Sequence, residues 1–179
     1  NTYERAATNK TEESVVMANT NNLLSPSSAV YYKYATGIKT GYTDTAGFCL
    51  VSSAKKNDRE LICVVLNDDD SRKDSQALLE YGFNNFKEIK IAKKGDLIGE
   101  VAVKQGADGN DHIRAVAISD ITVTIPNGAT SEDVKAKITY NSDTIYAPIK
   151  KGTSLGTVTY SYKGTTLGKV ELVAEKNIE

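Results

Sequence analysis

The stretch "ATGIKTGYTDTAGFCLVSS", residues 35–53, decides the fold of the first half of the chain. Lys39, Thr40 and Gly41 lie at the end of a short apolar segment. A turn-rich patch and then a β-rich run follow them. The runs "GFCLVSSAK" and "RELICVVLN" are joined by the polar "KND", which indicates a hairpin. The dense apolar run "LICVVL" is typical of a strand that is covered on both faces.

A helix is predicted after this hairpin, in "DDDSRKDSQALLEYGFNNF". Asp70 or Ser71 can cap it, and Asp74 lies early in it, where an acidic side chain is favoured. Leu78, Leu79, Gly82, Phe83 and Phe86 then recur at helical spacing. Residues 37–86 are therefore expected to form strand, strand, strand and helix. Residues 1–34 are interpreted as polar connections with short apolar pieces.

Residues 88–179 have a different sequence pattern, with short β-branched runs between glycines and no long helical pattern. Two pieces resemble each other, "KKGDLIGEVAV" from Lys93 and "KKGTSLGTVTY" from Lys150, and each is typical of a turn followed by a strand. The pattern predicts a small β-sandwich or barrel of about seven short strands. The domain boundary is expected near residues 87–92.

Composition excludes several classes of protein. The 179 residues suggest one or two domains, and the net charge of −1 provides no basic excess for nucleic acid. No apolar run approaches the roughly 20 residues that span a bilayer. The chain begins at Asn1 without methionine, so we expect it to be a processed or excised piece, and its N-terminus does not indicate a compartment.

The cysteines and the histidine do not predict a metal site. Cys49 and Cys63 lie in strand-like runs, where two buried thiols are favoured over a cross-strand disulfide, which needs specific geometry. The single histidine, His112, is expected in a polar surface loop. With no second histidine, neither a metal centre nor a serine–histidine relay is predicted.

Lys39, Thr40 and Gly41 form a K-T-G tripeptide, which is a weak signal alone but is strengthened by its place on a strand near a second hydroxyl, Thr43. The alternative interpretation is a solvated lysine at a strand end. A lysine and a hydroxyl side by side can bind a carboxylate by charge and hydrogen bonding. A glycine next to them lets another backbone lie against the strand.

In this context, "TGIKTGYTDTAGFCLVSSAKK" and the upstream "NTNNLL" resemble the last third of the transpeptidase domain of penicillin-binding proteins. The likeness is to the low-molecular-mass serine-type D-alanyl-D-alanine carboxypeptidases, whose C-terminal β-domain is similar to residues 88–179, with "APIKKGTSLGTV" and "VELVAE". The resemblance implies an α/β transpeptidase (β-lactamase-like) fragment over 1–87, with an antiparallel sheet and a C-terminal helix. A small all-β sandwich follows over 88–179.

The resemblance also implies roles for the residues of the K-T-G strand. Lys39 is the catalytic cation, and the backbone N–H of Tyr42 is an oxyanion-hole donor. Thr40, Gly41 and Thr43 bind the substrate, a peptidoglycan stem peptide that ends in D-Ala-D-Ala and pairs with the strand edge. The terminal D-alanine leaves through an acyl-enzyme that β-lactams trap. No cofactor or metal is implied.

Two of the family's three motifs do not match. The apparent S-x-x-K copy, Ser52 to Lys55, is rejected because residues three apart on a strand point to opposite faces. The S-x-N or Y-x-N motif is absent from the sequence. We therefore expect the nucleophile upstream of Asn1, and this chain to be inactive alone. Its partners would be the missing N-terminal part of the catalytic domain or a second copy, with no nucleic acid.

Two other classes remain as alternatives. The chain could be a non-catalytic, cell-wall-associated module in which the β-domain acts as a spacer or protein-contact platform. A β-lactamase relative is disfavoured, since β-lactamases resemble only the catalytic domain. By resemblance, the protein is expected outside the cytoplasm, peripheral on the outer face of the cytoplasmic membrane, with an anchor that is not in this chain.

Overall fold

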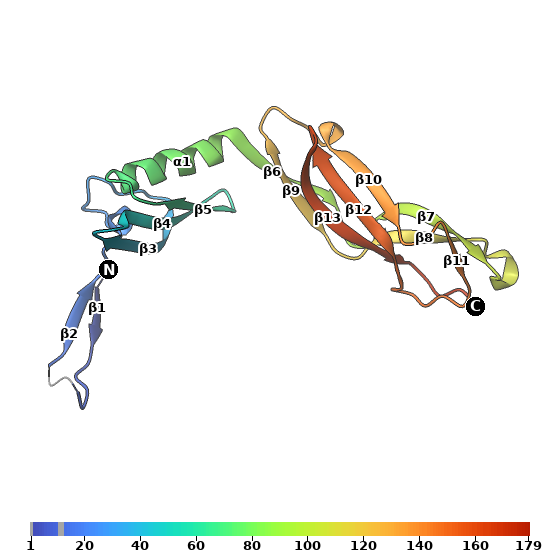
Figure 1. Cartoon of the computed structure of the whole chain (residues 1–179), viewed down its shortest axis with the longest axis horizontal. Coiled ribbons are helices and arrows are strands. Elements are labelled where there is room, and N and C mark those ends of the chain that lie inside the picture. The colour runs from blue at the N-terminus through green and yellow to red at the C-terminus, as the bar shows by residue number, and fades with distance from the viewer. Residues whose placement is uncertain (1, 11–12) are drawn as a thin grey trace. The chain divides into compact units, whose positions relative to one another are not determined.

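The structure, a computed structural model, describes residues 2–10 and 13–179. The chain divides into two compact units, Asn1–Asn85 and Phe86–Glu179, and each is described by itself. Figure 1 labels the elements of both units. Within the described residues, no helix is both long and apolar enough to cross a membrane.

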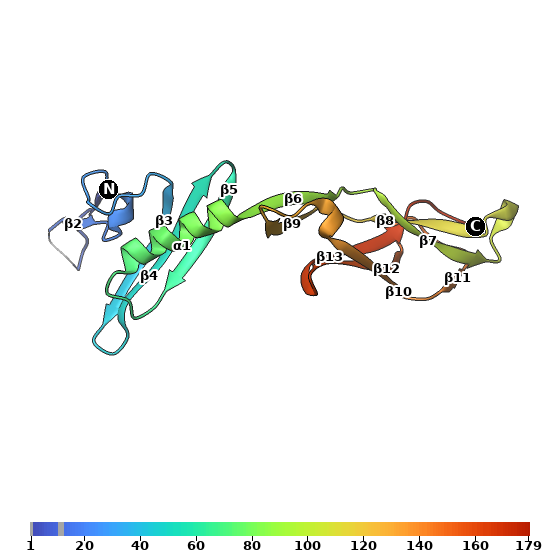
Figure 2. The ribbon, with the colours of Figure 1, turned by 90° about the horizontal axis from the view of Figure 1, so that it is seen from above.

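The first unit is built on an antiparallel sheet of three strands, β3 (Ala35–Thr43), β4 (Gly47–Lys56) and β5 (Arg59–Val65), in the order β3-β4-β5. The helix α1 (Ser71–Asn85) follows and runs along this sheet in both views (Figures 1 and 2). The expected order of strand, strand, strand and helix is confirmed.

The core of this unit lies between the sheet and the helix. One face of β4 and β5 is buried against α1 because their apolar residues alternate with the strand period and meet the helix at helical spacing. Gly82 allows a close approach, since a Cβ there would lie 2.7 Å from Leu61 Cδ1. The buried cluster consists of Leu23, Tyr32, Leu50, Ala54, Cys63, Val65, Leu79 and Phe83.

The N-terminal region differs from the expectation of polar connections alone. The strands β1 (Thr2–Arg5) and β2 (Val15–Ala18) pair antiparallel, and a short 3-10 helix, η1 (Asn22–Leu24), follows. All residues of β2 are exposed, so no burial pattern marks this hairpin in the sequence. Its strands are defined by backbone pairing, which the binary pattern does not encode.

A polar network ties residues before the sheet to the helix. The Tyr32 hydroxyl donates to Glu80 at 2.8 Å, and Lys56 Nζ donates to the same carboxylate at 3.2 Å. The hydrogen bond from Tyr32, followed by the hydrogen bond and charge of Lys56, lowers the pKa of Glu80. Burial, then the bond to Glu80, raises the pKa of Tyr32.

We predict that Glu80→Gln lowers the stability of the first unit by about 1 kcal/mol at neutral pH, because the replaced carboxylate accepts charge-assisted bonds at a partly exposed site. Since the pKa of Glu80 is lowered on folding, its contribution is present above the unfolded value and is lost as pH falls through the folded value. The difference in stability between wild type and variant should therefore begin to narrow as pH falls below the unfolded pKa of a glutamate, about 4.3, and it should shrink further at lower pH.

Thermal unfolding followed by the helical circular dichroism signal at several pH values measures this gap. Asp69→Asn is the control, because Asp69 is an exposed carboxylate of the same unit. A gap that stays constant down to pH 3 would show that the network does not depend on the Glu80 charge.

The second unit is a sandwich of a six-stranded sheet, in the order β10-β12-β13-β8-β7-β11, and a two-stranded sheet of β6 and β9. The prediction of a small β-sandwich is confirmed, although the strands number one more than expected. His112 is exposed as expected, but it begins a strand rather than lying in a loop. The strands are β6 (Phe86–Ala92), β7 (Leu97–Lys104), β8 (His112–Ala117), β9 (Ile121–Pro126), β10 (Lys135–Tyr140), β11 (Thr144–Tyr146), β12 (Ser154–Tyr162) and β13 (Thr165–Ala174).

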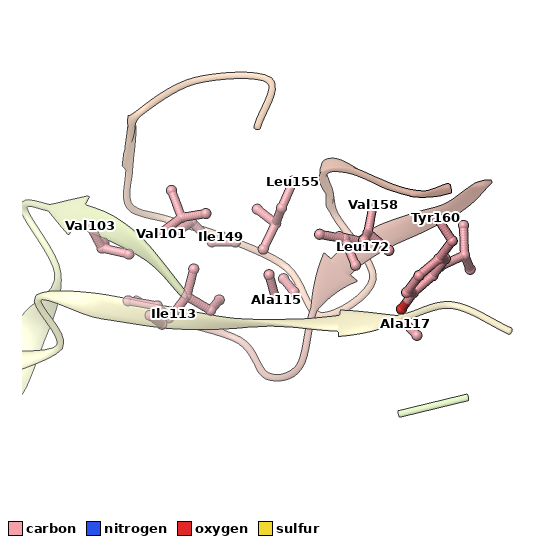
Figure 3. Close-up of a cluster of buried hydrophobic side chains, with 13 residues drawn as sticks. Val101, Val103, Ile113, Ala115, Ala117, Ile149, Leu155, Val158, Tyr160 and Leu172 are labelled. Atoms are coloured by element: carbon pink, nitrogen blue, oxygen red, sulfur yellow. The ribbon is translucent and has the colours of Figure 1, made fainter. Parts of the chain in front are cut away.

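The main core of this unit lies on one face of the large sheet. Figure 3 shows side chains from β7, β8, β12 and β13 gathered there, among them Ile113, Val158 and Leu172. A smaller cluster is formed by Val123 and Ile125 of β9 together with Ala129. The two "KKG" segments precede β7 and β12 as turns, as predicted. Each has a glycine with positive φ, +87° at Gly95 and +86° at Gly152, which other residues rarely adopt.

Candidate functional site

The predicted K-T-G strand is β3, which lies at one side of the three-stranded sheet and pairs with β4. Its register places Lys39 opposite Val51, and Gly41 opposite Cys49. Among the described residues, β3 has no strand on its other side. Its outer edge therefore offers backbone groups to a further extended segment.

A groove of about 450 Å³ lies against the end of this strand. Residues from three parts of the first unit meet in it: the segment before η1, the β3–β4 hairpin and the first turn of α1. Two of the described lining residues are cations and none is acidic, so the groove suits an anion. Its lining consists of Thr20, Lys39, Thr40, Gly41, Tyr42, Phe48, Cys49 and Arg72.

Lys39 and Thr40 are held by short polar contacts at the groove. Lys39 is exposed, and its Nζ donates to the backbone oxygen of Thr40 at 2.7 Å. The Thr40 hydroxyl forms a hydrogen bond with the hydroxyl of Thr20, which the sequence analysis did not select. The structure thus brings an ammonium group and a positioned hydroxyl together on one strand.

Gly41 is not required by the packing of the protein itself. A Cβ at this position would lie 3.9 Å from the Cβ of Cys49, an ordinary contact, and no positive φ demands glycine. The open space above Gly41 is therefore available to whatever enters the groove, in keeping with the expectation that another backbone lies there.

Tyr42 and Thr43 complete the predicted set. The Tyr42 ring packs on Phe48, with the ring centroids 4.6 Å apart. Thr43 lies at the end of β3 and is not among the lining residues, and its hydroxyl accepts the backbone N–H of Ala46 at 3.0 Å. Thr43 therefore helps to close the β3–β4 turn. Its contact with a substrate stays a prediction.

Arg72 is the lining residue that sequence reasoning missed. It stands in the first turn of α1, where the helix dipole disfavours a cation. Its Nε is buried and has no hydrogen-bond partner. Its unfavourable helix position is visible in the sequence, but that signal does not place Arg72 at the groove.

The apparent S-x-x-K copy does not form a nucleophile and base. Ser52 is fully buried on β4, and its hydroxyl has no partner. Lys55 is exposed and pairs with Asp58 at 3.7 Å. The expectation that these two side chains do not meet is confirmed.

The described residues contain no group of His, Cys, Asp and Glu that could hold a metal ion. His112 contacts the carboxylate of Asp111 at 3.1 Å, and the hydrogen bond from His112 lowers the pKa of Asp111.

Both cysteines are free thiols, Cys63 buried and Cys49 half-buried. The interpretation of two buried thiols thus holds for Cys63, whereas Cys49 is more accessible because it lines the groove.

We predict that iodoacetamide alkylates Cys49 roughly 10-fold faster than Cys63, because the reagent reaches the half-buried thiol more readily than the buried one. Peptide mass spectrometry of time points measures both rates in one sample. Cys49→Ser should leave the slow rate of Cys63 unchanged. Equal rates would mean that Cys49 does not face the groove.

The chain matches two family models that meet at neighbouring parts of the sequence. Residues 1–70 match the D-alanyl-D-alanine carboxypeptidase family, and residues 86–179 match the penicillin-binding protein 5 C-terminal domain. The second match alone covers more than half of the chain. The chain therefore belongs to the penicillin-binding protein 5 family of D-alanyl-D-alanine carboxypeptidases.

Individual relatives agree with this. The D-alanyl-D-alanine carboxypeptidase DacF of Bacillus subtilis is 29% identical over 181 residues, which cover 99% of this chain and 44% of that protein. DacA of Escherichia coli K12 is 32% identical over 145 residues, covering 79% of this chain and 35% of that protein. The chain thus spans less than half the length of these relatives.

Solved structures show the same fold. Penicillin-binding protein 5 from Haemophilus influenzae matches with a TM-score of 0.72 and 29% identity, over 98% of this chain and 48% of that one. A peptidoglycan synthesis regulatory factor (PBP3) from Streptococcus pneumoniae matches with a TM-score of 0.70 and 29% identity, over 92% of this chain and 48% of that one.

Proposed function

We propose that β3 and its groove form one wall of the active site of a serine-type D-alanyl-D-alanine carboxypeptidase. The observation that carries this proposal is the K-T-G strand with two cations and no acid in its groove, in a chain of this family. The substrate would be a peptidoglycan stem peptide that ends in D-Ala-D-Ala. The reaction would release the terminal D-alanine through an acyl-enzyme.

Lys39 and Thr40 would recognise the terminal carboxylate of the substrate. A charge-assisted hydrogen bond from an ammonium group is stronger than one between neutral groups. Lys39 is free to give up its bond to the Thr40 carbonyl, because its side chain is exposed. Arg72 would add a second positive charge, since its side chain lines the same groove.

The backbone of β3 would hold the reacting end of the substrate. An extended peptide adds to an open sheet edge through main-chain hydrogen bonds, and the space above Gly41 leaves room for it. The N–H of Tyr42 would donate to the carbonyl oxygen as it gains charge. One such donor typically lowers the barrier by ~3–4 kcal/mol.

The nucleophile would come from a segment that this sequence does not include. Ser52 cannot serve, because it is fully buried. The face of β5 that points away from α1 exposes Ile62 by 67% and Val64 by 57%, and Leu66 just beyond it by 70%. We infer that the nucleophile-bearing part of the protein, or a second copy of this chain, covers these side chains.

The working location would be outside the cytoplasm, peripheral on the outer face of the cytoplasmic membrane, where the stem peptides lie. The second candidate function is a non-catalytic, cell-wall-associated module. The buried Ser52 and the absence of S-x-N from the sequence favour it for this chain on its own. The open groove with its two cations favours the enzyme.

Labelling with fluorescent penicillin tests whether this chain has a nucleophile of its own. We expect no label on the 19.3 kDa chain, because Ser52, the serine of the apparent S-x-x-K copy, is fully buried and its hydroxyl has no partner. A denaturing gel with intact mass measurement detects an acyl adduct directly. Label on this chain would mean that the rejection of Ser52 is wrong.

In the full-length protein, Lys39→Ala should slow acylation by penicillin about 10- to 100-fold, since it removes a charge-assisted hydrogen bond to the ligand carboxylate. Lys55→Ala is the matched control, because Lys55 is an exposed lysine of the adjacent strand, outside the groove lining. Equal rates for wild type and Lys39→Ala would overturn the role of Lys39.

A further inference from the structure

The two "KKG" turns of the second unit make the same hydrogen bonds to the large sheet. The Gly95 N–H donates to the Ala117 oxygen at 2.8 Å, and the Gly152 N–H donates to the Ala174 oxygen at 2.9 Å. Each alanine N–H donates back to the residue after the glycine, at 3.0 and 2.9 Å. The sequence repeat is therefore a structural repeat, in which each turn is fixed to the end of a central strand.

The residues that cap the two turns correspond as well. The Lys94 N–H donates to the Asp120 side chain at 2.9 Å, and the Lys151 N–H donates to the Asn177 side chain at 2.7 Å. Each of these residues of the first turn lies the same number of positions before its counterpart in the second turn. The strands β8 and β13 run antiparallel with Val116 directly opposite Val173. The two turns are thus related by a local two-fold axis that passes through this valine pair.

A groove of about 550 Å³ lies between the two turns, over this valine pair. Val116 and Val173 are 7% and 9% exposed, yet they belong to none of the core clusters of the described residues. By strand alternation, they point away from the main core that contains Ala115 and Leu172. They form an apolar floor, to which Ile118 adds an exposed side chain.

The charges around this floor are unbalanced. Lys94 and Lys151 line the groove from its two related sides, and neither ammonium group has an ionic partner among the described residues. The one acidic lining residue, Glu175, is already paired with Arg114 at 2.9 Å. The groove therefore has two uncompensated cations with apolar surface between them.

We propose that this groove binds an extended acidic peptide segment of another protein, with apolar side chains over the valines and a carboxylate beside each lysine. The volume lies in the range of small ligand sites, and the mainly apolar lining with a few charges is typical of them. A single small anion would pair with one lysine and leave the floor uncovered. A flat bilayer surface does not follow a concave groove, so a chain segment fits it better.

The test uses this chain, labelled with ¹⁵N, and synthetic peptides in which one, two or three apolar residues separate two glutamates. At least one of them should shift the amide signals of Gly95 and Gly152 with a Kd on the order of 1 mM or below. The same peptides with glutamine in place of glutamate should bind about 10-fold more weakly.

The double variant Lys94→Ala with Lys151→Ala should weaken binding about 10-fold, because it removes both cations. Lys137→Ala with Lys169→Ala is the matched control, since it removes two exposed lysines of the same sheet outside the groove, and it should bind as wild type does.

Three results would overturn the proposal: no peptide of the set shifts these glycines, the glutamine peptides bind equally well, or the control variant loses as much affinity. Binding to phosphatidylglycerol vesicles that needs Lys94 and Lys151, without binding to any peptide, would assign the groove to lipid headgroups instead.

Discussion

The register of β3 against β4 is the constraint on which the candidate site depends. Burial sets it: Leu50 and Ala54 of β4 are 1% and 0% exposed because that face of the strand meets α1. Each residue of β3 then has a fixed partner, Thr40 opposite Leu50 and Gly41 opposite Cys49. A slip by one residue would move every side chain of β3 to the other face of the sheet, so the helix packing also sets the chemistry of the groove.

The site is therefore carried by a strand that is paired with the core strand β4, while its open edge is left without a partner strand among the described residues. Rigid elements hold polar groups more precisely than loops do, which suits a wall that must recognise a carboxylate. Arg72 links the two layers, since it comes from the helix that fixes the strand register and lines the groove beside that strand. The same packing leaves Ile62 and Val64 exposed on the face away from the helix.

Much of the fold was predictable because its periodicity is strong. The β-rich runs in 47–65 and the helical spacing after Asp70 predict the sheet and α1, and both are confirmed. The expectation that the run "LICVVL" is covered on both faces is wrong for the described residues, since Ile62 and Val64 are exposed. The hairpin of β1 and β2 was not predictable, because its apolar residues are exposed and leave no burial pattern. The repeated "KKG" segments were visible in the sequence, but their common hydrogen bonds to Ala117 and Ala174 appear only when distant strands are paired.

The candidate site was predictable in part. A local motif identifies Lys39 to Thr43, whereas Thr20 and Arg72 reach the groove from segments that are distant in sequence. No local pattern encodes such a meeting, because it depends on where α1 begins relative to β3. The roles of Lys39 and Tyr42 stay predictions that rest on the family and on the geometry of the groove.

The most direct test of the central claim is a crystal structure of the full-length protein acylated by a penicillin. We expect the ligand carboxylate to lie within hydrogen-bonding distance of Lys39 Nζ or the Thr40 hydroxyl. We also expect the acyl oxygen to lie within about 3 Å of the Tyr42 nitrogen. An acylated ligand whose carboxylate and acyl oxygen both lie away from β3 would contradict the assigned roles of Lys39 and Tyr42.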